Sequence, residues 1–302
     1  MRGLVISGGG SKGAFAVGVL KYLIGIKAHQ YDYIAGTSTG ALIAPLAATR
    51  EIDKLEEIYT TRETKDILKK RELFDIGRLI TKGITLEDFD SFFDVAPLRE
   101  FAKQILFPRY DAIMSSNITV MFSAICLQDA EITYFSTKPI NNNSKFEAVL
   151  IENKEQMLNA IMASANQPVL MPPVEFTKRL PTRQYVDGGV REYAPIQGVI
   201  ANNVDEIDVI LHSPPLMPFT PGRFDNIIDI LKQTISIFSE DVAVNDLDVA
   251  ILLAKENGIK INVYRPKREL PIKDSLVFNP LVMRDVLNTG YNIAEEIYPS
   301  GA

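Results

Sequence analysis

The chain has 302 residues, of which 46% are hydrophobic and 23% are charged, and its formal net charge is -6. This composition predicts a globular protein with a sizeable core and excludes a disordered or fibrous chain. A mildly acidic chain without blocks of Lys and Arg is also a poor nucleic-acid binder, because neutralising phosphates requires clustered cations.

The first fifty residues form two predicted strand–turn–helix units. The strands are GLVIS (3–7) and YDYIAGTS (31–38), and the helices that follow them are KGAFAVGVLKYLIG (12–25) and GALIAPLAAT (40–49). This repetition predicts an α/β fold whose central sheet is mostly parallel.

The rest of the chain continues the alternation of helices and strands without a repeat or a linker. We expect a β-hairpin turning at Gln128 and Asp129, strands at 183–189, 206–212 and 259–266, and helices at 51–70, 97–106, 153–165, 195–203, 223–258 and 280–298. The sequence therefore predicts one domain over residues 1–302. Its motif-bearing core covers about 3–215, and a helical part with a last strand covers about 216–302.

Residues that form disulfides or bind metals are few. Cys126 is the single cysteine and lies in an apolar run, so we expect a buried small side chain. His29 and His212 are the two histidines, and no HExxH or CxxC spacing occurs. The sequence predicts no metal ion and no cofactor, and it predicts an exposed loop position for His29.

Ser38 stands in the pentapeptide GTSTG, between Gly36 and Gly40. An apolar strand precedes it and an apolar helix follows, which is the context of a nucleophile elbow. A sharp strand-to-helix turn forces the serine into a strained conformation and exposes its hydroxyl at the positive end of a helix, where an oxyanion is favoured. Ser38 is therefore the candidate nucleophile.

The stretch SGGGSKGAF contains Gly8, Gly10 and Gly13 in the spacing GxGxxG, after a strand and before a helix. This spacing also occurs in dinucleotide-binding proteins, but they place an acidic residue at the end of the second strand, whereas Asp32 lies at its beginning. A Walker A loop would need Gly-Lys-Ser/Thr after four spacers, which this stretch lacks. Free N–H groups of consecutive glycines favour an oxyanion hole instead.

Asp187 follows a short predicted strand and precedes Gly188 and Gly189, which let the chain turn away at once. An ordinary loop aspartate would fit this pattern equally well. A carboxylate held against a serine hydroxyl in a desolvated site can, however, accept its proton as charge develops on the substrate. We therefore interpret Asp187 as the candidate base for Ser38.

Together, GGGSKG, GTSTG and DGG resemble, in this order, the motifs of the patatin-like phospholipases. The stretch MASANQPVLMPPV resembles the Ala-Ser and proline-rich loop that this family places ahead of its catalytic aspartate. The resemblance spans at least Leu4 to Gly189. One departure is Ser7, where many members of the family have Asp.

The resemblance implies a three-layer α/β/α fold and a Ser–Asp dyad for acyl-ester hydrolysis. Carried over by position, Ser38 is the nucleophile, Asp187 is the general base, and Lys12 takes the place of a Lys or Arg that the family commonly has. Backbone amides of Gly9, Gly10 and Ser11 would form the oxyanion hole. No calcium-dependent lipid-binding domain accompanies these motifs, so no calcium requirement is expected.

A Ser–Asp–His triad is the alternative to a dyad, since Ser38, Asp187 and His212 occur in the chain order of α/β-hydrolases. Against it, His212 ends a predicted strand, where a structural histidine is the ordinary expectation. The sequence thus favours the dyad.

The expected activity is that of a phospholipase A or lysophospholipase that acts on a lipid or membrane-surface substrate. A soluble esterase or thioesterase, and a non-catalytic lipid-binding or interaction protein, remain as alternatives. The apolar residues between Phe89 and Leu98 are expected to be mostly core, with one or two exposed phenylalanines suited to docking at lipid.

The sequence shows neither a signal peptide nor a stretch of about 20 apolar residues that could span a membrane. We therefore expect a cytoplasmic protein that can associate with membranes peripherally.

Overall fold

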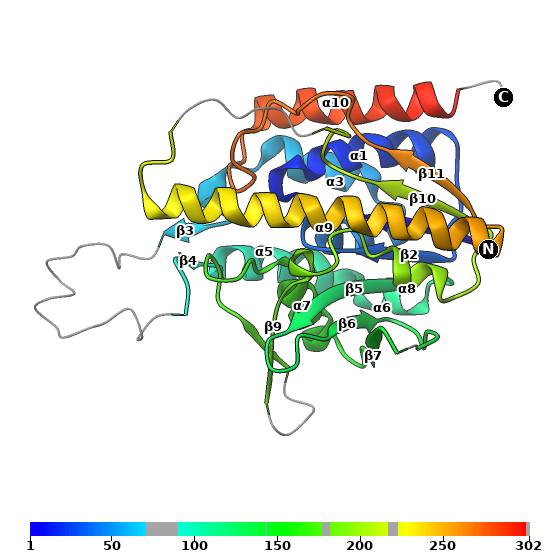
Figure 1. The fold of residues 1–302 in the computed structure, drawn as a ribbon, viewed down its shortest axis with the longest axis horizontal. Helices are drawn as coiled ribbons and strands as arrows, with labels where there is room; N and C mark the ends of the chain where they lie inside the picture. Colours follow the sequence, from blue (N-terminus) through cyan, green and yellow to red (C-terminus); the bar gives the residue numbers. More distant parts are fainter. Residues whose placement is uncertain (71–89, 143, 177–181, 217–222, 300–302) are drawn as a thin grey trace, which may run out of the picture.

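A nine-stranded sheet organises the part of the chain that the computed structural model describes, which is residues 1–70, 90–142, 144–176, 182–216 and 223–299 (Figure 1). In chain order its strands are β1 (Arg2–Ile6), β2 (Tyr33–Gly36), β5 (Thr119–Cys126), β6 (Ile132–Ser136), β7 (Phe146–Leu150), β8 (Val174–Phe176), β9 (Arg183–Asp187), β10 (Glu206–Ile210) and β11 (Lys260–Tyr264).

Most strand pairs in this sheet are parallel. The strands β11, β10, β1, β2 and β5 pair in that order, each parallel to the next, and β6 is parallel to β7. Antiparallel pairing joins β5 to β6, β5 to β9 and β8 to β9. The mostly parallel sheet and the hairpin β5–β6 that the sequence predicts are both confirmed.

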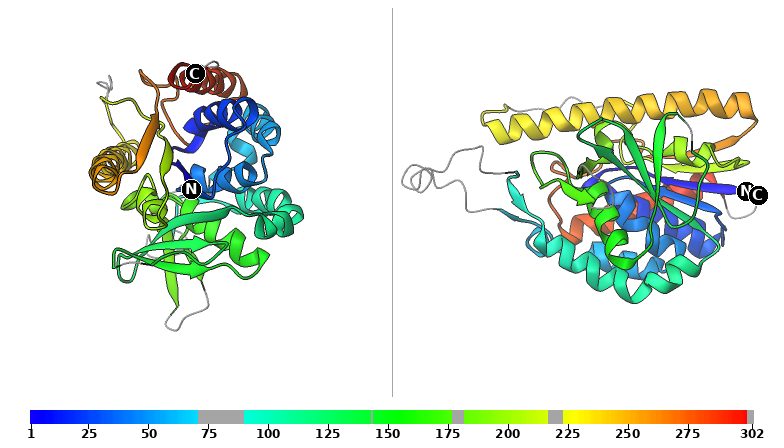
Figure 2. Two further views of the ribbon diagram at one scale, coloured as in Figure 1. Left: turned by 90° about the vertical axis from the view of Figure 1, so that its right-hand side faces the viewer. Right: turned by 90° about the horizontal axis from the view of Figure 1, so that it is seen from below.

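Helices cover both faces of the sheet (Figure 2). They are α1 (Gly13–Leu20) with its π-helical continuation η2 (Lys21–Ile26), α2 (Thr39–Ala48), α3 (Ile52–Thr61), α5 (Ala96–Leu106), α6 (Tyr110–Ser115), α7 (Lys154–Ala165), α8 (Ile196–Ile200), α9 (Ile227–Asn257) and α10 (Pro280–Ile297). Figure 2 shows α8 and α9 on one side of the sheet and α1, α3 and α10 on the other.

The alternation of side chains along β1 explains the three layers. Leu4 and Ile6 point into the core shared with the helices around α1, whereas Val5 packs with Val199 of α8 and Leu247 of α9. Successive residues of a strand face opposite sides, so a strand that is apolar throughout requires cover on both. The three-layer α/β/α class is thereby confirmed.

The long helices begin and end where the sequence places strong capping residues. The side chain of Asn226 accepts a hydrogen bond from the Asp229 N–H at the start of α9, and Gly258 ends this helix with a φ of 69°. Asn279 caps α10 in the same way, with Pro280 in the first turn. Both helices agree with the predicted ranges to within a few residues.

The helix predicted over 51–70 is shorter than expected. It ends at Thr61, and the next residue, Arg62, is extended, before the short 3-10 turn η3 (Thr64–Asp66). The hydroxyls of Thr60 and Thr61 donate to carbonyls one turn back, a bond that weakens helix ends.

Several short elements were missed from the sequence. They are α6, β7 and β8 and the ribbon of β3 (Lys69–Lys70) with β4 (Phe93–Asp94).

The described apolar residues between Phe89 and Leu98 are mostly core, as expected. Phe93, Val95 and Leu98 are buried, and Phe92 is half-buried against the same cluster. Phe89 lies outside the described residues.

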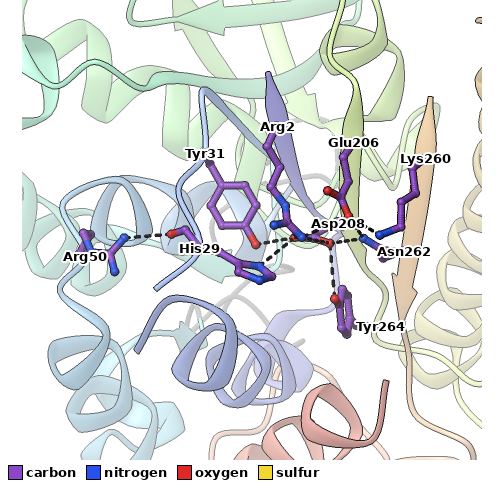
Figure 3. Close-up of polar contacts among 9 residues, drawn as sticks. All are labelled: Arg2, His29, Tyr31, Arg50, Glu206, Asp208, Lys260, Asn262 and Tyr264. Atoms are coloured by element: carbon purple, nitrogen blue, oxygen red, sulfur yellow. Dashed lines mark hydrogen bonds and ion pairs between the residues drawn. The ribbon is translucent and has the colours of Figure 1, made fainter. Parts of the chain in front are cut away.

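A buried polar network surrounds Asp208 of β10 (Figure 3). The carboxylate is fully buried and lies 3.0 Å from a guanidinium nitrogen of Arg2. Tyr31 O–H donates to it over 2.7 Å, and Asn262 Nδ2 over 2.8 Å. His29 is 8% exposed, with Nδ1 3.6 Å from the carboxylate. The prediction of an exposed His29 is therefore wrong, because the histidine is buried beside this carboxylate.

Within the described ranges, no helix combines the length and the apolar content that crossing a membrane would require, α9 included.

Candidate active site

Ser38 occupies a strained turn between β2 and α2. It is the residue that precedes α2, and its φ of 56° and ψ of -120° lie outside the regions that residues other than glycine favour. Its N–H group lies 3.1 Å from both the carbonyl oxygen and the hydroxyl of Ser164. Such a conformation costs about 1–3 kcal/mol and persists where the surroundings enforce it. The elbow expected from the sequence is present.

The two glycines of the elbow are required by close backbone contacts. A Cβ on Gly36 would lie 2.2 Å from the carbonyl oxygen of Gly40, and one on Gly40 would lie 2.1 Å from that of Ile6. Any side chain at either position would therefore collide with main-chain atoms and push the turn apart.

Strand pairing brings Asp187 to this turn from a distant part of the chain. β2 runs parallel to β5 and ends with Gly36 beside Phe122, whereas β9 runs antiparallel to β5 and ends with Asp187 beside Ala124. The two strands thus approach each other end to end along one side of β5. Ser38 and Asp187 emerge at the meeting point and line the same pocket.

Asp187 is buried and poorly solvated. It is 4% exposed, and its Oδ1 accepts a hydrogen bond from the Gly189 N–H over 2.8 Å. Burial raises the pKa of Asp187 to about 6, although hydrogen bonding from the Ser38 side chain and from the Gly189 amide lowers it. The carboxylate is therefore ionised at neutral pH and yet considerably more basic than an exposed aspartate.

Gly188 allows the chain to pass directly over β5. A Cβ at this position would lie 2.4 Å from the hydroxyl of Ser123 and 2.7 Å from its carbonyl oxygen. This close approach explains why a glycine follows Asp187.

The glycine loop after β1 lies beside the elbow. A Cβ on Gly8 would lie 3.3 Å from that of Ser38, and Gly10 has a φ of +55°. Across the described residues, no backbone hydrogen bond is recorded from the N–H of Gly9 or Gly10. The N–H of Ser11, in contrast, donates to the carbonyl of Ser275 over 2.8 Å. Of the three amides assigned to the oxyanion hole, that of Ser11 is thus occupied by the protein itself.

Lys12 and Gly13, the remaining motif residues of the loop, have different surroundings. Lys12 Nζ lies 4.0 Å from Glu240 of α9, and Lys12 lines the pocket that contains Ser38. A Cβ on Gly13 would lie 2.5 Å from the hydroxyl of Tyr59. Gly13 therefore serves close packing of α1 against α3.

His212 lies beneath the glycine loop. Its Nδ1 is 2.7 Å from the carbonyl oxygen of Gly8, which can only accept, so Nδ1 carries the proton. Burial lowers the pKa of His212 to about 4, which keeps the ring neutral. Among the described residues, Nε2 has no hydrogen-bond partner. In a triad the two nitrogens would bind a carboxylate and the serine, so this arrangement favours a structural histidine.

Two pockets meet at Ser38. The first, which we call the polar pocket, has a mixed lining that includes the charged residues Lys12 and Asp187 together with residues of α9. The second has about 970 Å³ of empty volume, part of it open to solvent, and is lined mainly by apolar side chains. These are Leu42, Leu46, Leu55, Ile58, Ile67, Leu68, Leu98, Phe101, Ala102, Ile105, Leu106, Ala165, Met171, Leu276 and Phe278. Within the described part of the chain, no group of three or more His, Cys, Asp or Glu residues could hold a metal ion.

Sequence reasoning assigned no role to the residues that hold Ser38 and Asp187 in place. Ser164 accepts the Ser38 N–H, and the carbonyl of Asn166 accepts the Asp187 N–H over 2.9 Å. Both residues belong to the stretch ASANQP at the end of α7, so one helix terminus fixes both candidate catalytic residues. The stretch itself was noticed in the sequence as part of the family resemblance.

Comparison with known proteins identifies the family to which these motifs belong. Residues 4–200 match the family model described as patatin-like phospholipase. The chain is 42% identical over 99 residues to a cUMP-AMP-activated phospholipase of Escherichia coli, an alignment that covers 29% of this chain and 31% of that protein. It is 25% identical over 244 residues to an uncharacterized protein of Acanthamoeba polyphaga mimivirus, covering 69% of this chain and 63% of that protein.

Both alignments cover less than two thirds of the relatives' own length. Among solved structures, VipD from Legionella pneumophila superposes with a TM-score of 0.44 at 12% identity, over 98% of this chain and 66% of that one.

Proposed function

Because the chain belongs to the patatin-like phospholipase family, we propose that it is a lipid acyl hydrolase that cleaves ester bonds of phospholipids or lysophospholipids through Ser38 and Asp187. The observation that carries this proposal is the meeting of a strained serine and a buried carboxylate where an apolar and a polar pocket join.

In the acylation step, Ser38 Oγ attacks the carbonyl carbon of the ester while Asp187 takes the hydroxyl proton. A base whose pKa lies slightly below neutral suits this task, because it is ionised and still accepts a proton readily. The N–H groups of Gly9 and Gly10 hold the negative oxygen of the tetrahedral intermediate. Collapse of the intermediate expels the alcohol, which takes the proton from Asp187 and leaves an acyl-serine.

Deacylation repeats these steps with water. Asp187 takes a proton from the water molecule that attacks the acyl-serine, and the second tetrahedral intermediate uses the same amides. Its collapse returns the proton to Ser38 and releases a fatty acid.

The two pockets support an amphipathic substrate. One acyl chain fits the apolar pocket, whose walls come from α2, α3 and α5, and the head group fits the polar pocket next to Asp187. Val190 and Phe224 line the polar pocket and are 48% and 42% exposed, which suits contact with a lipid surface around its mouth. A peripheral location at membranes follows from this proposal.

The test is product analysis on vesicles of mixed phospholipids and lysophospholipids. We expect release of free fatty acid by the wild-type protein and none above background by Ser38→Ala, whose folding is checked by circular dichroism. Equal release by the two proteins would overturn the proposal.

A soluble esterase with the same pair of residues predicts different kinetics. A lipid-surface enzyme should accelerate when the substrate passes from monomers to micelles or vesicles, whereas an esterase should not. Covalent labelling of Ser38 by a fluorophosphonate would separate both enzymes from a non-catalytic lipid-binding protein.

A further inference from the structure

The apolar pocket follows the helix that begins directly after Ser38. The α2 residues that line it, Thr39, Leu42 and Leu46, recur every three or four positions, so they share one face of the helix. Leu46 lies eight residues after Ser38. A helical rise of about 1.5 Å per residue places it about 12 Å from Ser38 along the helix. The pocket thus extends about two turns of α2 away from the candidate nucleophile.

The second wall of the pocket, α3, runs antiparallel to α2. Near Ser38, the hydroxyls of Tyr59 and Thr39 share a hydrogen bond. At the other end of α2, the N–H of Glu51, the residue before α3, donates to the carbonyl of Leu46 over 2.8 Å. The third wall is α5, which contributes residues of both its first and its last turn. Three helices therefore flank the pocket from Ser38 to its far end.

An ion pair ties α5 to α3 at the far end of the pocket. Arg109, which follows α5, donates from Nε to both carboxylate oxygens of Glu51 over 2.8 Å. Its Nη1 donates to the carbonyl of Ile105, also over 2.8 Å. Three leucines within about one turn of this ion pair line the pocket and are only 1%, 2% and 4% exposed; we call them the floor: Leu46, Leu55 and Leu106.

We propose that the floor limits the acyl chain that the pocket accommodates to about eight to ten carbons, so that the enzyme selects medium-chain esters. This inference rests on the proposed function, because it places the ester carbonyl at Ser38. With carbon–carbon bonds of about 1.5 Å, an extended chain advances about 1.3 Å per carbon, and about 12 Å holds about nine carbons. Each methylene buried above the floor favours binding, whereas carbons beyond the floor add nothing.

The experiment measures kcat/KM for p-nitrophenyl esters whose acyl chains range from four to sixteen carbons. Each ester is diluted into micelles of the same nonionic detergent, so that the lipid surface is constant along the series. We expect kcat/KM of the wild-type protein to rise about two- to fourfold per added carbon, up to about ten carbons, and then to stop rising. A steady rise through sixteen carbons would overturn the proposal.

Two variants move the chain length at which the rise stops in opposite directions. Leu46→Ala deepens the pocket and should extend the rise by about two or three carbons, whereas Leu42→Phe narrows it one turn from Ser38 and should end the rise earlier. The matched control is Leu158→Ala on α7. It removes the same atoms from the same core at a site that is 1% exposed and lines neither pocket, so the stopping point should not move.

Two negative results have different meanings. If the wild-type protein, Leu46→Ala and Leu42→Phe hydrolyse the esters with the same stopping point, the floor is overturned while Ser38 remains the nucleophile. If the wild-type protein hydrolyses no ester of the series faster than Ser38→Ala, both the floor and the proposed function are contradicted. Rates are normalised to folded protein, because a loss of stability lowers all rates together and leaves the stopping point in place.

Discussion

Asp187 and Asp208 are two buried aspartates of one sheet whose pKa values are shifted in opposite directions. They are 4% and 0% exposed, so both lose most of their hydration. Burial raises the pKa of Asp187 to about 6, against hydrogen bonding from Ser38 and the Gly189 amide. Burial likewise acts to raise the pKa of Asp208, but the neighbouring His29, the hydrogen bond from Tyr31 and the charge of Arg2 outweigh it and lower the pKa below its ordinary value.

The difference lies in the partners that the fold supplies. Asp208 has a guanidinium, a phenol and an amide donor at hydrogen-bond distance, whereas Asp187 has one backbone amide and the serine that it would deprotonate. A fully partnered carboxylate stabilises the fold and is chemically inert. A poorly partnered one costs stability and stays basic, which is the property that a general base needs.

Replacing Asp187 by Asn should produce the largest change in activity and the opposite change in stability. We expect lipid hydrolysis to fall by about 10³-fold, within the range that general bases contribute. The free energy of unfolding at pH 8 should rise by up to about 3 kcal/mol, since an ionised buried carboxylate is removed. Denaturant titration and a fatty-acid assay check the two parts. A stability loss with the activity retained would contradict this account of Asp187.

Replacing Asp208 by Asn should lower stability and leave activity nearly unchanged, the reverse of the outcome for Asp187→Asn. Arg2 loses its buried anion, so the free energy of unfolding should fall by about 3 kcal/mol at pH 7, as for other broken buried pairs. The remaining folded protein should hydrolyse lipid at nearly the wild-type rate per folded molecule. Loss of turnover in protein that remains folded would show that the network also supports the site.

Lowering the pH distinguishes the titration of Asp187 from that of Asp208 without mutating either residue. Asp187 binds a proton below about pH 6, so kcat/KM should fall about tenfold for each further pH unit. Its raised pKa means that the stability difference between Asp187→Asn and the wild-type protein is largest above pH 6. The difference should shrink as pH falls and vanish near the unfolded value of about 4.

The lowered pKa of Asp208 gives stability the opposite dependence on pH. Its contribution to stability is complete above the unfolded value of about 4 and is lost only as pH falls further, through the folded value. Unfolding curves of Asp208→Asn and of the wild-type protein should therefore converge only in strong acid. Convergence of the two curves already near pH 6 would contradict a lowered pKa for Asp208.

The smallest effect is expected for Tyr31→Phe. This change removes one donor, at 2.7 Å from Asp208, and leaves Arg2 and Asn262 in place. The free energy of unfolding should fall by about 1–2 kcal/mol, with lipid hydrolysis unchanged. A loss of unfolding free energy as large as that of Asp208→Asn would mean that Arg2 and Asn262 cannot stabilise the Asp208 carboxylate without Tyr31.

Local patterns explain why much of the fold could be predicted. The strand, the elbow and the helix around Ser38 lie within twenty residues, and Gly36 is required by a contact inside that unit, whereas Gly40 is required by the neighbouring strand β1. Asp187 could be connected to Ser38 through the family resemblance and the need for a base, whereas their approach along β5 depends on strand pairing.

Long-range contacts explain what was missed. The burial of His29 depends on Asp208, and the occupied amide of Ser11 depends on Ser275, far along the chain. Neither contact leaves a periodic pattern or a turn signal in the sequence. Their partners are set by the tertiary fold alone.

The most direct test of the pairing of Ser38 with Asp187 compares lipid hydrolysis by Asp187→Asn and His212→Asn, each normalised to folded protein. Asn at position 212 keeps a donor for the Gly8 carbonyl, so the loop above it is preserved. We expect activity to be lost in Asp187→Asn and to stay within a few-fold of wild type in His212→Asn. Loss in His212→Asn as complete as in Ser38→Ala, with activity retained in Asp187→Asn, would contradict the account.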